Sequence, residues 1–218
     1  MNPKDLAIVS IGENYDGRNY YKIKFNDLNR DLVMDNVYIF GLDNAVRGSK
    51  FPMAVDVNAV NTDITKTTKN LASVNAGTGH DQFLTGIIAQ FDLTFTVKAW
   101  TEAERYHFFD FISSQSTMPR ISKFDLDAQY IDYVDPRMIE VMNKLKDKYN
   151  ETGDKEDYLR LLYSNPCGFK LTAAMTTNYR QLKIIYNQRK NHLLPEWRTL
   201  CEQLEHFPYF NELCFKED

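Results

Sequence analysis

TTNYRQLKIIYNQR, residues 176–189, is the stretch of this chain that predicts most about its fold. Its residues recur at helical spacing and share one face: Leu182, Ile185, Tyr186 and Arg189. Thr176 or Thr177 is a suitable N-cap for this helix. Arg189 therefore lies on, or at the edge of, the face that packs against protein. Because burying a guanidinium without a partner is costly, we expect Arg189 to meet an anion or a polar ligand.

The start of the same helix also favours anions. Asn178 and Arg180 fall in its first turn, where exposed backbone N–H groups attract phosphate. With Arg189 farther along the helix, the layout fits a nucleotide. The alternative is a solvated helix with ordinary surface arginines, since cations near a helix C-terminus complement the helix dipole.

Composition limits the classes of partner. The chain has 218 residues, of which 43% are hydrophobic and 26% charged, as in a globular protein with a real core. A net charge of −4 gives no global attraction to nucleic acid or to an anionic membrane, so we expect neither as a partner. No apolar run reaches the roughly 18 residues of a membrane span, and the first residues, MNPKD, show no apolar signal region.

The cysteines point to a reducing compartment. Cys167, Cys201 and Cys214 are odd in number and widely spaced, without zinc-ligand spacing, so we expect neither a disulfide framework nor a metal site. A cytoplasmic location is the prediction.

Apolar alternation predicts strands, most clearly over residues 87–100. Shorter strands are expected at 6–11, 20–25 and 37–40, followed by a loop at 43–52. Helices are expected at 62–74 (capped by Thr62 or Asp63), at 102–111, at 135–149 with Pro136 in the first turn, at 157–163 and from Pro195. A helical turn is expected at 82–86, and loops at 75–81, 112–120 and 150–154. The helix at 135–149 should pack through Met138, Val141, Met142, Leu145 and Tyr149, and the last helix through Trp197, Leu200, Cys201 and Leu204. These elements predict one α+β domain.

Common catalytic motifs are absent, and the weaker candidates have structural alternatives. Residues 75–80 hold a lone Gly-x-Gly, which is typical of a turn, and no cysteine has a local base that would activate it. Ser114 and Ser116 lie in a polar loop between Arg105 and Arg120, which suits a phosphate or an ordinary surface loop.

The order of these features resembles the flavin-dependent thymidylate synthase family. Two blocks carry the resemblance, residues 80–120 and 166–197, whereas the first 60 residues match poorly. In the family, an Asn-x-Arg-x-Leu segment begins a helix at the flavin site, and Asn178, Arg180 and Leu182 fall on that pattern. Arg189 falls on a family arginine that contacts the pyrimidine of dUMP.

Other positions match less closely. The family signature is Arg-His-Arg, seven residues and then Ser, whereas this chain has Arg105-Tyr106-His107 and Gln115 at the serine position. Arg120 falls on a later phosphate-binding arginine if the loop is longer here. His80 matches a family histidine on the flavin, His192 lies near another, and Trp197 matches an aromatic after an insertion of one residue.

The resemblance implies a single α+β domain over residues 1–218, with an antiparallel or mixed sheet and a helical layer. Residues 1–60 would be an N-terminal strand region and residues 75–205 the family core. The implied catalytic residue is Arg189, with these residues at the cofactor: His80, Arg105, Asn178, Arg180 and His192. The implied substrate-binding residues are Ser114, Ser116, Arg120 and Arg189.

The implied reaction transfers a one-carbon unit from methylenetetrahydrofolate to C5 of dUMP or a related pyrimidine nucleotide, with FAD reduced by NADPH. Family members are homotetramers with shared sites, so an oligomer is implied. One alternative is a catalytically inactive nucleotide-binding protein on the same fold. Another is an unrelated α+β interaction protein, with which the 13% aromatic content is compatible.

Overall fold

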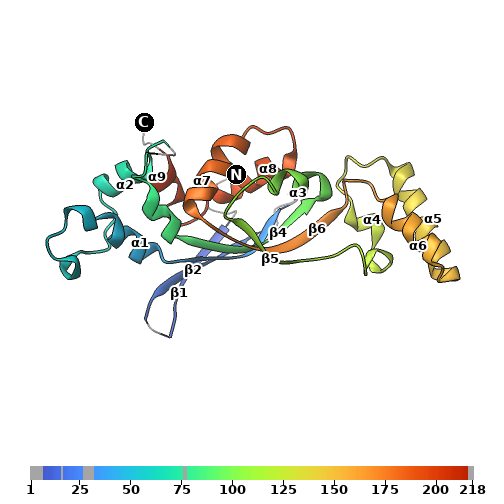
Figure 1. Cartoon of the computed structure of the whole chain (residues 1–218), viewed down its shortest axis with the longest axis horizontal. Coiled ribbons are helices and arrows are strands. Elements are labelled where there is room, and N and C mark those ends of the chain that lie inside the picture. Colours follow the sequence, from blue (N-terminus) through green and yellow to red (C-terminus); the bar gives the residue numbers. More distant parts are fainter. Residues whose placement is uncertain (1–6, 16, 27–31, 76–77, 216–218) are drawn as a thin grey trace. The chain divides into compact units, whose positions relative to one another are not determined.

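A six-stranded sheet runs through the structure, a computed structural model that describes residues 7–15, 17–26, 32–75 and 78–215. The strand order is β1-β2-β3-β4-β6-β5 (Figure 1). Strands β1, β2 and β3 each pair antiparallel with the next strand along the chain. The strands are β1 (Ala7–Glu13), β2 (Asn19–Phe25), β3 (Met34–Phe40), β4 (Ile88–Thr96), β5 (Phe109–Ser114) and β6 (Lys170–Asn178). The predicted α+β class with an antiparallel sheet is confirmed.

Helices fill most of the chain between the strands. The α-helices are α1 (Leu42–Ser49), α2 (Lys66–Ala72), α3 (Val97–Ala103), α4 (Leu126–Gln129), α5 (Pro136–Thr152), α6 (Lys155–Tyr163), α7 (Tyr179–Arg189), α8 (Pro195–Leu204) and α9 (Phe210–Cys214). The 3-10 helices are η2 (Phe51–Met53), η3 (Val57–Ala59), η4 (Gln82–Gly86) and η5 (Ile121–Lys123).

The chain divides into two compact units, each described by itself below. The first contains residues 1–93, 106–112 and 174–218, and the second residues 94–105 and 113–173. The single domain expected over residues 1–218 stays a prediction.

Strand β4 confirms the alternation seen in the sequence, but it is shorter than expected. Ala89, Phe91 and Leu93 are buried, and Gln90 between them is exposed. The strand was expected to reach residue 100 and instead ends at Thr96. The Thr96 side chain accepts a hydrogen bond from the Ala99 N–H at 3.1 Å and so caps α3.

The prediction of a helix at 102–111 is wrong, because α3 ends at Ala103 and β5 begins at Phe109. The loop expected at 112–120 is wrong at its start for the same reason, since β5 continues to Ser114. Strand β6 was not expected at all. Its buried residues Ala173, Met175 and Thr177 alternate with half-buried ones. The alternation of buried and less buried positions that is typical of a strand was therefore present, but it was carried mainly by small side chains.

Helix α7 begins one to two residues later than the sequence suggested. Thr176 and Thr177 belong to β6, and the N-cap is Asn178, whose Oδ1 accepts from the Gln181 N–H at 2.9 Å. An asparagine cap leaves Arg180 in the first turn as expected. Leu182 and Ile185 are buried, which confirms the predicted apolar face.

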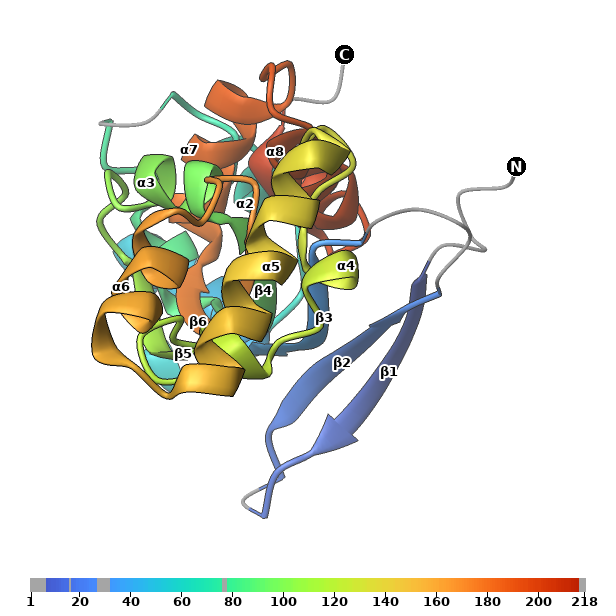
Figure 2. The ribbon, with the colours of Figure 1, turned by 90° about the vertical axis from the view of Figure 1, so that its right-hand side faces the viewer.

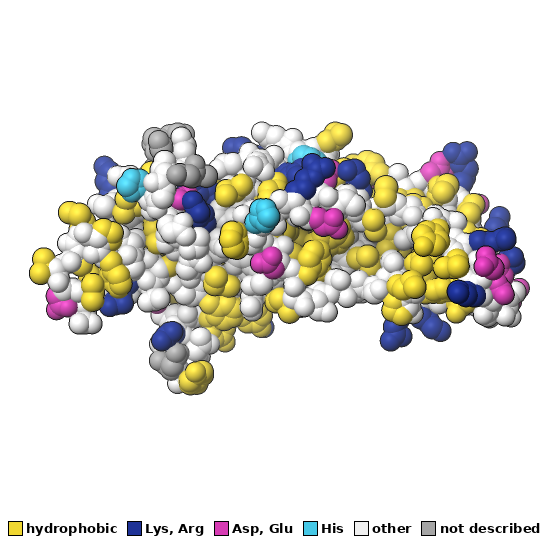
Figure 3. Space-filling view, in the orientation of Figure 1, with side chains coloured by type: hydrophobic (Ala, Val, Ile, Leu, Met, Phe, Trp, Pro, Cys, Tyr) yellow, Lys and Arg dark blue, Asp and Glu magenta, His cyan; other side chains and the backbone are white. Residues whose placement is uncertain are grey.

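The N-terminal strands form a hairpin, and Figure 2 shows β1 and β2 side by side. The strands expected at 6–11, 20–25 and 37–40 are confirmed within the described residues, since residue 6 lies outside them. Both faces of β1 are solvent-exposed, through Ile8, Val9 and Ile11. Figure 3 shows hydrophobic side chains at the surface in this region.

The loop expected at 43–52 is wrong, because α1 occupies most of it. Leu42, Ala45 and Val46 are buried at helical spacing, and Gly41 provides the left-handed conformation (φ 79°) that precedes the helix. Helix α2 is shorter than the expected 62–74. Its cap is Thr65, which accepts from the Thr68 N–H at 3.2 Å, rather than Thr62 or Asp63.

The core of the first unit lies between the sheet and its helices. Val37, Ile39 and Phe91 are buried on the sheet, and the α8 residues expected to pack are all buried: Trp197, Leu200, Cys201 and Leu204. Helix α7 packs against α8, α9 and η4. Gln203 on α8 is also buried, and its Oε1 accepts from the N–H groups of Val33 and Met34 at 3.0 and 2.9 Å, which ties α8 to the start of β3.

The second unit has a core of its own. Its buried side chains come from η5 through α6 and from the residue before β6: Ile121, Leu126, Tyr130, Met142, Leu161 and Phe169. Asp135 caps α5 through the Arg137 N–H, as the Asp-Pro start predicts, but the helix continues to Thr152. Met138 and Val141 were expected in the core and are exposed, whereas Ile139 packs against it. Helix α6 confirms the one expected at 157–163 and starts at Lys155.

Among the described residues, no helix is both long and apolar enough to cross a membrane.

Candidate functional site

A buried carboxylate anchors two cations of α7. Asp81, which is fully buried, accepts a hydrogen bond from Arg180 Nε to its Oδ1 at 3.1 Å and one from Lys183 Nζ to its Oδ2 at 3.3 Å. Lys183 is also buried and donates to the carbonyls of Ala72 and Val74 at 2.7 and 2.6 Å. Asp81 was not among the site residues expected from the sequence, although it follows His80 directly.

Arg180 contacts its carboxylate partner through one of its three guanidinium nitrogens. Its hydrogen bond to Asp81 uses Nε, and within the described residues its two terminal nitrogens have no hydrogen-bond partner. The side chain is 26% exposed and lines a cavity of about 480 Å³. The cavity is lined by η4, the segment before β5 and the start of α7: Gln82, Thr85, His107, Phe108, Asn178, Arg180, Gln181 and Ile184. A guanidinium fixed in this way is prepared to donate two parallel hydrogen bonds to a phosphate or carboxylate.

Arg189 lies among aromatic rings at the other end of α7. Its Nε donates to the Tyr106 hydroxyl at 2.7 Å, and its Nη1 lies 2.8 Å from Nε2 of His192. Its guanidinium carbon is 4.7 Å from the ring centroid of Trp197, which is fully buried, and 5.4 Å from that of Tyr106. These contacts hold a cation beside π faces, where it is stabilised by the ring quadrupoles.

Tyr106 is the second residue that the sequence analysis missed. It stands in the middle of the Arg105-Tyr106-His107 signature, and its hydroxyl accepts from Arg189 while donating to Gln188 Oε1 at 2.8 Å. Its ring meets Trp197 edge-on at 5.8 Å. Tyr106 therefore places a phenol hydroxyl directly on Arg189.

The expected site residues of the first unit are brought together only in part. Asn178 and Arg180 line the cavity, and His192 contacts Arg189. His80 is exposed and does not line this cavity, so its flavin contact stays a prediction.

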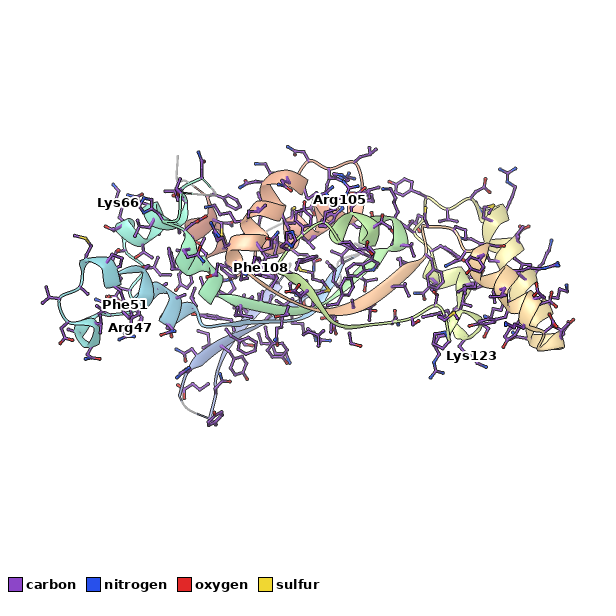
Figure 4. All side chains as sticks on the ribbon, viewed as in Figure 1. Arg47, Phe51, Lys66, Arg105, Phe108 and Lys123 are labelled. Atoms are coloured by element: carbon purple, nitrogen blue, oxygen red, sulfur yellow. The ribbon has the colours of Figure 1, made fainter. Side chains whose placement is uncertain are left out.

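The other expected site residues belong to the second unit: Arg105, Ser114, Ser116 and Arg120. All are exposed, and Figure 4 labels Arg105. Ser114 ends β5, and Arg120 precedes η5. Their roles at phosphate or flavin stay predictions.

No cysteine near the site is set up as a nucleophile. Burial and the nearby Glu205 and Glu202 raise the pKa of Cys201 to about 12. Burial also raises the pKa of Cys214, which lies beside a second cavity of about 390 Å³ together with Lys183, Ile184 and Asn187. Both groups therefore remain neutral thiols at physiological pH.

We expect only one thiol of the native protein to react with iodoacetamide near neutral pH, because Cys167 is exposed and the other two are buried. Raising the pH by about two units should not expose a reactive thiolate at Cys201, because its pKa of about 12 stays above that range. Mass spectrometry of the alkylated peptides measures this, with denatured protein labelled at all three positions as the control. Rapid native labelling of Cys201 or Cys214 would contradict the burial described here.

Within the part of the chain that the structure describes, no group of three or more His, Cys, Asp or Glu side chains is placed to hold a metal ion.

The fold is similar to that of the flavin-dependent thymidylate synthase ThyX from Helicobacter pylori, solved with FAD and dUMP. One such crystal structure has a TM-score of 0.65 at 16% identity and covers 82% of this chain and 97% of that chain. A second has a TM-score of 0.66 at 16% identity, with coverages of 84% and 97%.

A further similar structure is the UMP/dUMP methylase PolB from Streptomyces cacaoi, bound with 5-Br UMP. Its TM-score is 0.52 at 13% identity, and it covers 78% of this chain and 87% of that chain. No protein-family model and no curated protein matches the sequence. At these identities the likeness shows the fold alone, so the chemistry must be argued from the site.

Proposed function

We propose that this protein is a divergent flavin-dependent thymidylate synthase-like enzyme, which transfers a one-carbon unit from methylenetetrahydrofolate to C5 of dUMP or a related pyrimidine nucleotide. The observation that carries the proposal is the fixed guanidinium of Arg180, which is held through Nε by the buried Asp81 and belongs to a residue that lines the cavity. The similarity to ThyX and PolB, which were solved with pyrimidine nucleotides, supports the substrate class.

The residues at the cavity fit a flavin nucleotide. Arg180 offers two N–H groups to a phosphate, Asn178 offers a polar edge, and Phe108 and Ile184 offer apolar surface to a ring system. A volume of about 480 Å³ lies within the range of small-molecule sites. A bound FAD, once reduced by NADPH, would supply the two electrons that reduce the transferred one-carbon unit.

Arg189 is the residue we assign to the pyrimidine. A guanidinium beside a uracil carbonyl stabilises the negative charge that develops on the oxygen when C5 becomes nucleophilic. Tyr106, His192 and Trp197 fix this side chain, so little reorganisation is needed when the charge develops. The raised pKa of Cys201 and of Cys214 fits a reaction without a thiol nucleophile.

Several parts of the proposal rest on the resemblance. NADPH as the reductant and methylenetetrahydrofolate as the donor come from it, as do the homotetramer and the substrate-phosphate contacts of Ser114, Ser116 and Arg120. The cytoplasmic location rests on the cysteine pattern. Each is part of the proposed function.

A catalytically inactive nucleotide-binding protein is the second candidate, and the two polar contacts of Arg189 favour it. A guanidinium that keeps its hydrogen bonds to Tyr106 and His192 while a nucleotide occupies the cavity at Arg180 does not act on the pyrimidine, so the nucleotide binds without reacting.

The test of the proposed function is turnover. The protein is incubated with FAD, NADPH, methylenetetrahydrofolate and dUMP, and dTMP is measured by mass spectrometry. Formation of dTMP supports the enzyme. Binding of FAD and dUMP without any product, at protein concentrations comparable with substrate, supports the inactive binding protein instead.

Arg180→Ala should weaken FAD binding by about 10- to 100-fold, because a charge-assisted hydrogen bond contributes roughly 1.5–3 kcal/mol. Arg180→Lys keeps the charge but loses the fork geometry, so it should recover only part of the affinity. Isothermal titration with FAD measures both. Arg137→Ala, on the exposed surface of the second unit, is the matched control. Unchanged affinity in Arg180→Ala would remove Arg180 from the flavin site.

A further inference from the structure

Phe108 has a backbone conformation that its side chain makes costly. Its φ is 59°, in the left-handed region that residues with bulky side chains rarely occupy. Phe108 is 68% exposed, so burial does not offset this cost. Strain that is retained without a packing gain is typical of residues that serve a binding site.

A buried hydroxyl holds this conformation in place. Thr177, which is 4% exposed on β6, donates a hydrogen bond from Oγ1 to the carbonyl oxygen of Phe108 at 2.6 Å. Thr177 therefore satisfies the carbonyl that the turn leaves at the start of β5. The hydrogen bond from Thr177 thus holds the backbone of Phe108, while the side chain of Phe108 remains exposed to solvent.

Phe108 lines the cavity that Arg180 also lines (Figure 4 labels Phe108). The two residues thus border the same space of about 480 Å³. An exposed aromatic face next to a cation suits a ligand that carries a planar ring and a phosphate, because base–aromatic stacking and charge-assisted hydrogen bonds then act on one molecule.

We propose that Phe108 is a binding residue whose ring stacks on a planar ring of the nucleotide held at Arg180, and that Thr177 positions it. The inference rests on the proposed function, which makes FAD that nucleotide. The inference goes beyond the proposed function by assigning a role to Phe108, a position that the signature leaves unspecified, and to the strained backbone of this chain at that residue.

The test compares FAD affinity by calorimetry with thermal stability. Phe108→Gly should weaken FAD binding about tenfold, the loss expected from one stacked ring, while Tm rises because glycine relieves the positive φ. Phe108→Tyr should keep the affinity within about twofold, since its ring stacks as well. Phe111→Ala, at an exposed aromatic residue within β5, is the matched control and should bind FAD normally.

The positioning role has its own pair of variants. Thr177→Val removes the hydroxyl at nearly constant volume and should weaken FAD binding, whereas Thr177→Ser should retain it. If wild type binds FAD and both Phe108→Gly and Thr177→Val bind it equally well, the inference is wrong and the proposed function stands. If wild type binds no FAD, both are overturned.

Discussion

Asp81→Asn is expected to lower the free energy of unfolding by about 3–5 kcal/mol, the cost of leaving a buried charge without its partner. Asp81 is fully buried between Arg180 and Lys183, and Lys183 is 3% exposed. The amide keeps the shape of the carboxylate but not its charge, and one of its two terminal atoms becomes a donor facing a cation. Chemical denaturation followed by circular dichroism measures the loss.

Two further variants distinguish the effect of the buried ion pairs of Asp81 with Arg180 and Lys183 from the effect of removing any surface charge. Asp110→Asn removes an exposed carboxylate from the neighbouring β5 and should change the free energy of unfolding by less than about 0.5 kcal/mol. Asp81→Asn combined with Lys183→Met removes both charges and should cost less than the sum of the single changes. Additive losses, or a loss in Asp81→Asn no larger than in Asp110→Asn, would contradict the assigned role of Asp81.

Arg189→Ala is expected to reduce dUMP turnover by about 10²- to 10³-fold, the usual effect of removing one preorganised donor from a developing oxyanion. Its stability cost should be about 1 kcal/mol, because the substitution removes a cation–π interaction with Trp197 and a hydrogen bond to Tyr106. Steady-state kinetics and thermal unfolding measure the two effects separately.

The controls for Arg189 distinguish charge from geometry. Lys190→Ala removes the adjacent exposed cation and should leave turnover unchanged. Arg189→Lys keeps a positive charge without the planar fork and should recover only a small part of the rate. Turnover retained in Arg189→Ala would show that the guanidinium does not act on the pyrimidine.

Local patterns in the sequence were sufficient for much of the fold. The alternation of β4 and the helical spacing of Leu182 and Ile185 depend on neighbours within a few residues, and both are seen in the structure. Strand β6 was missed because Ala173 and Ala174 carry little apolar signal, and because Thr176 and Thr177 resemble helix caps. Helix α1 was missed because a short helix after a glycine reads as a loop.

The candidate site could be predicted only where its residues share one helix. Asn178, Arg180 and Arg189 all belong to α7 or its cap, so their spacing is visible in the sequence. Asp81 and Tyr106 are missed for the opposite reason. Each lies more than 80 positions from the arginine that it contacts, and only the packing of the sheet and helices brings them there.

The most direct test of the proposed function is the visible absorbance spectrum of the purified protein after reconstitution with FAD and removal of the free cofactor. We predict retained flavin bands in about one-to-one ratio with the chain, and a shift of those bands when dUMP is added. A spectrum without flavin, from folded protein incubated with excess FAD, would contradict the flavin enzyme.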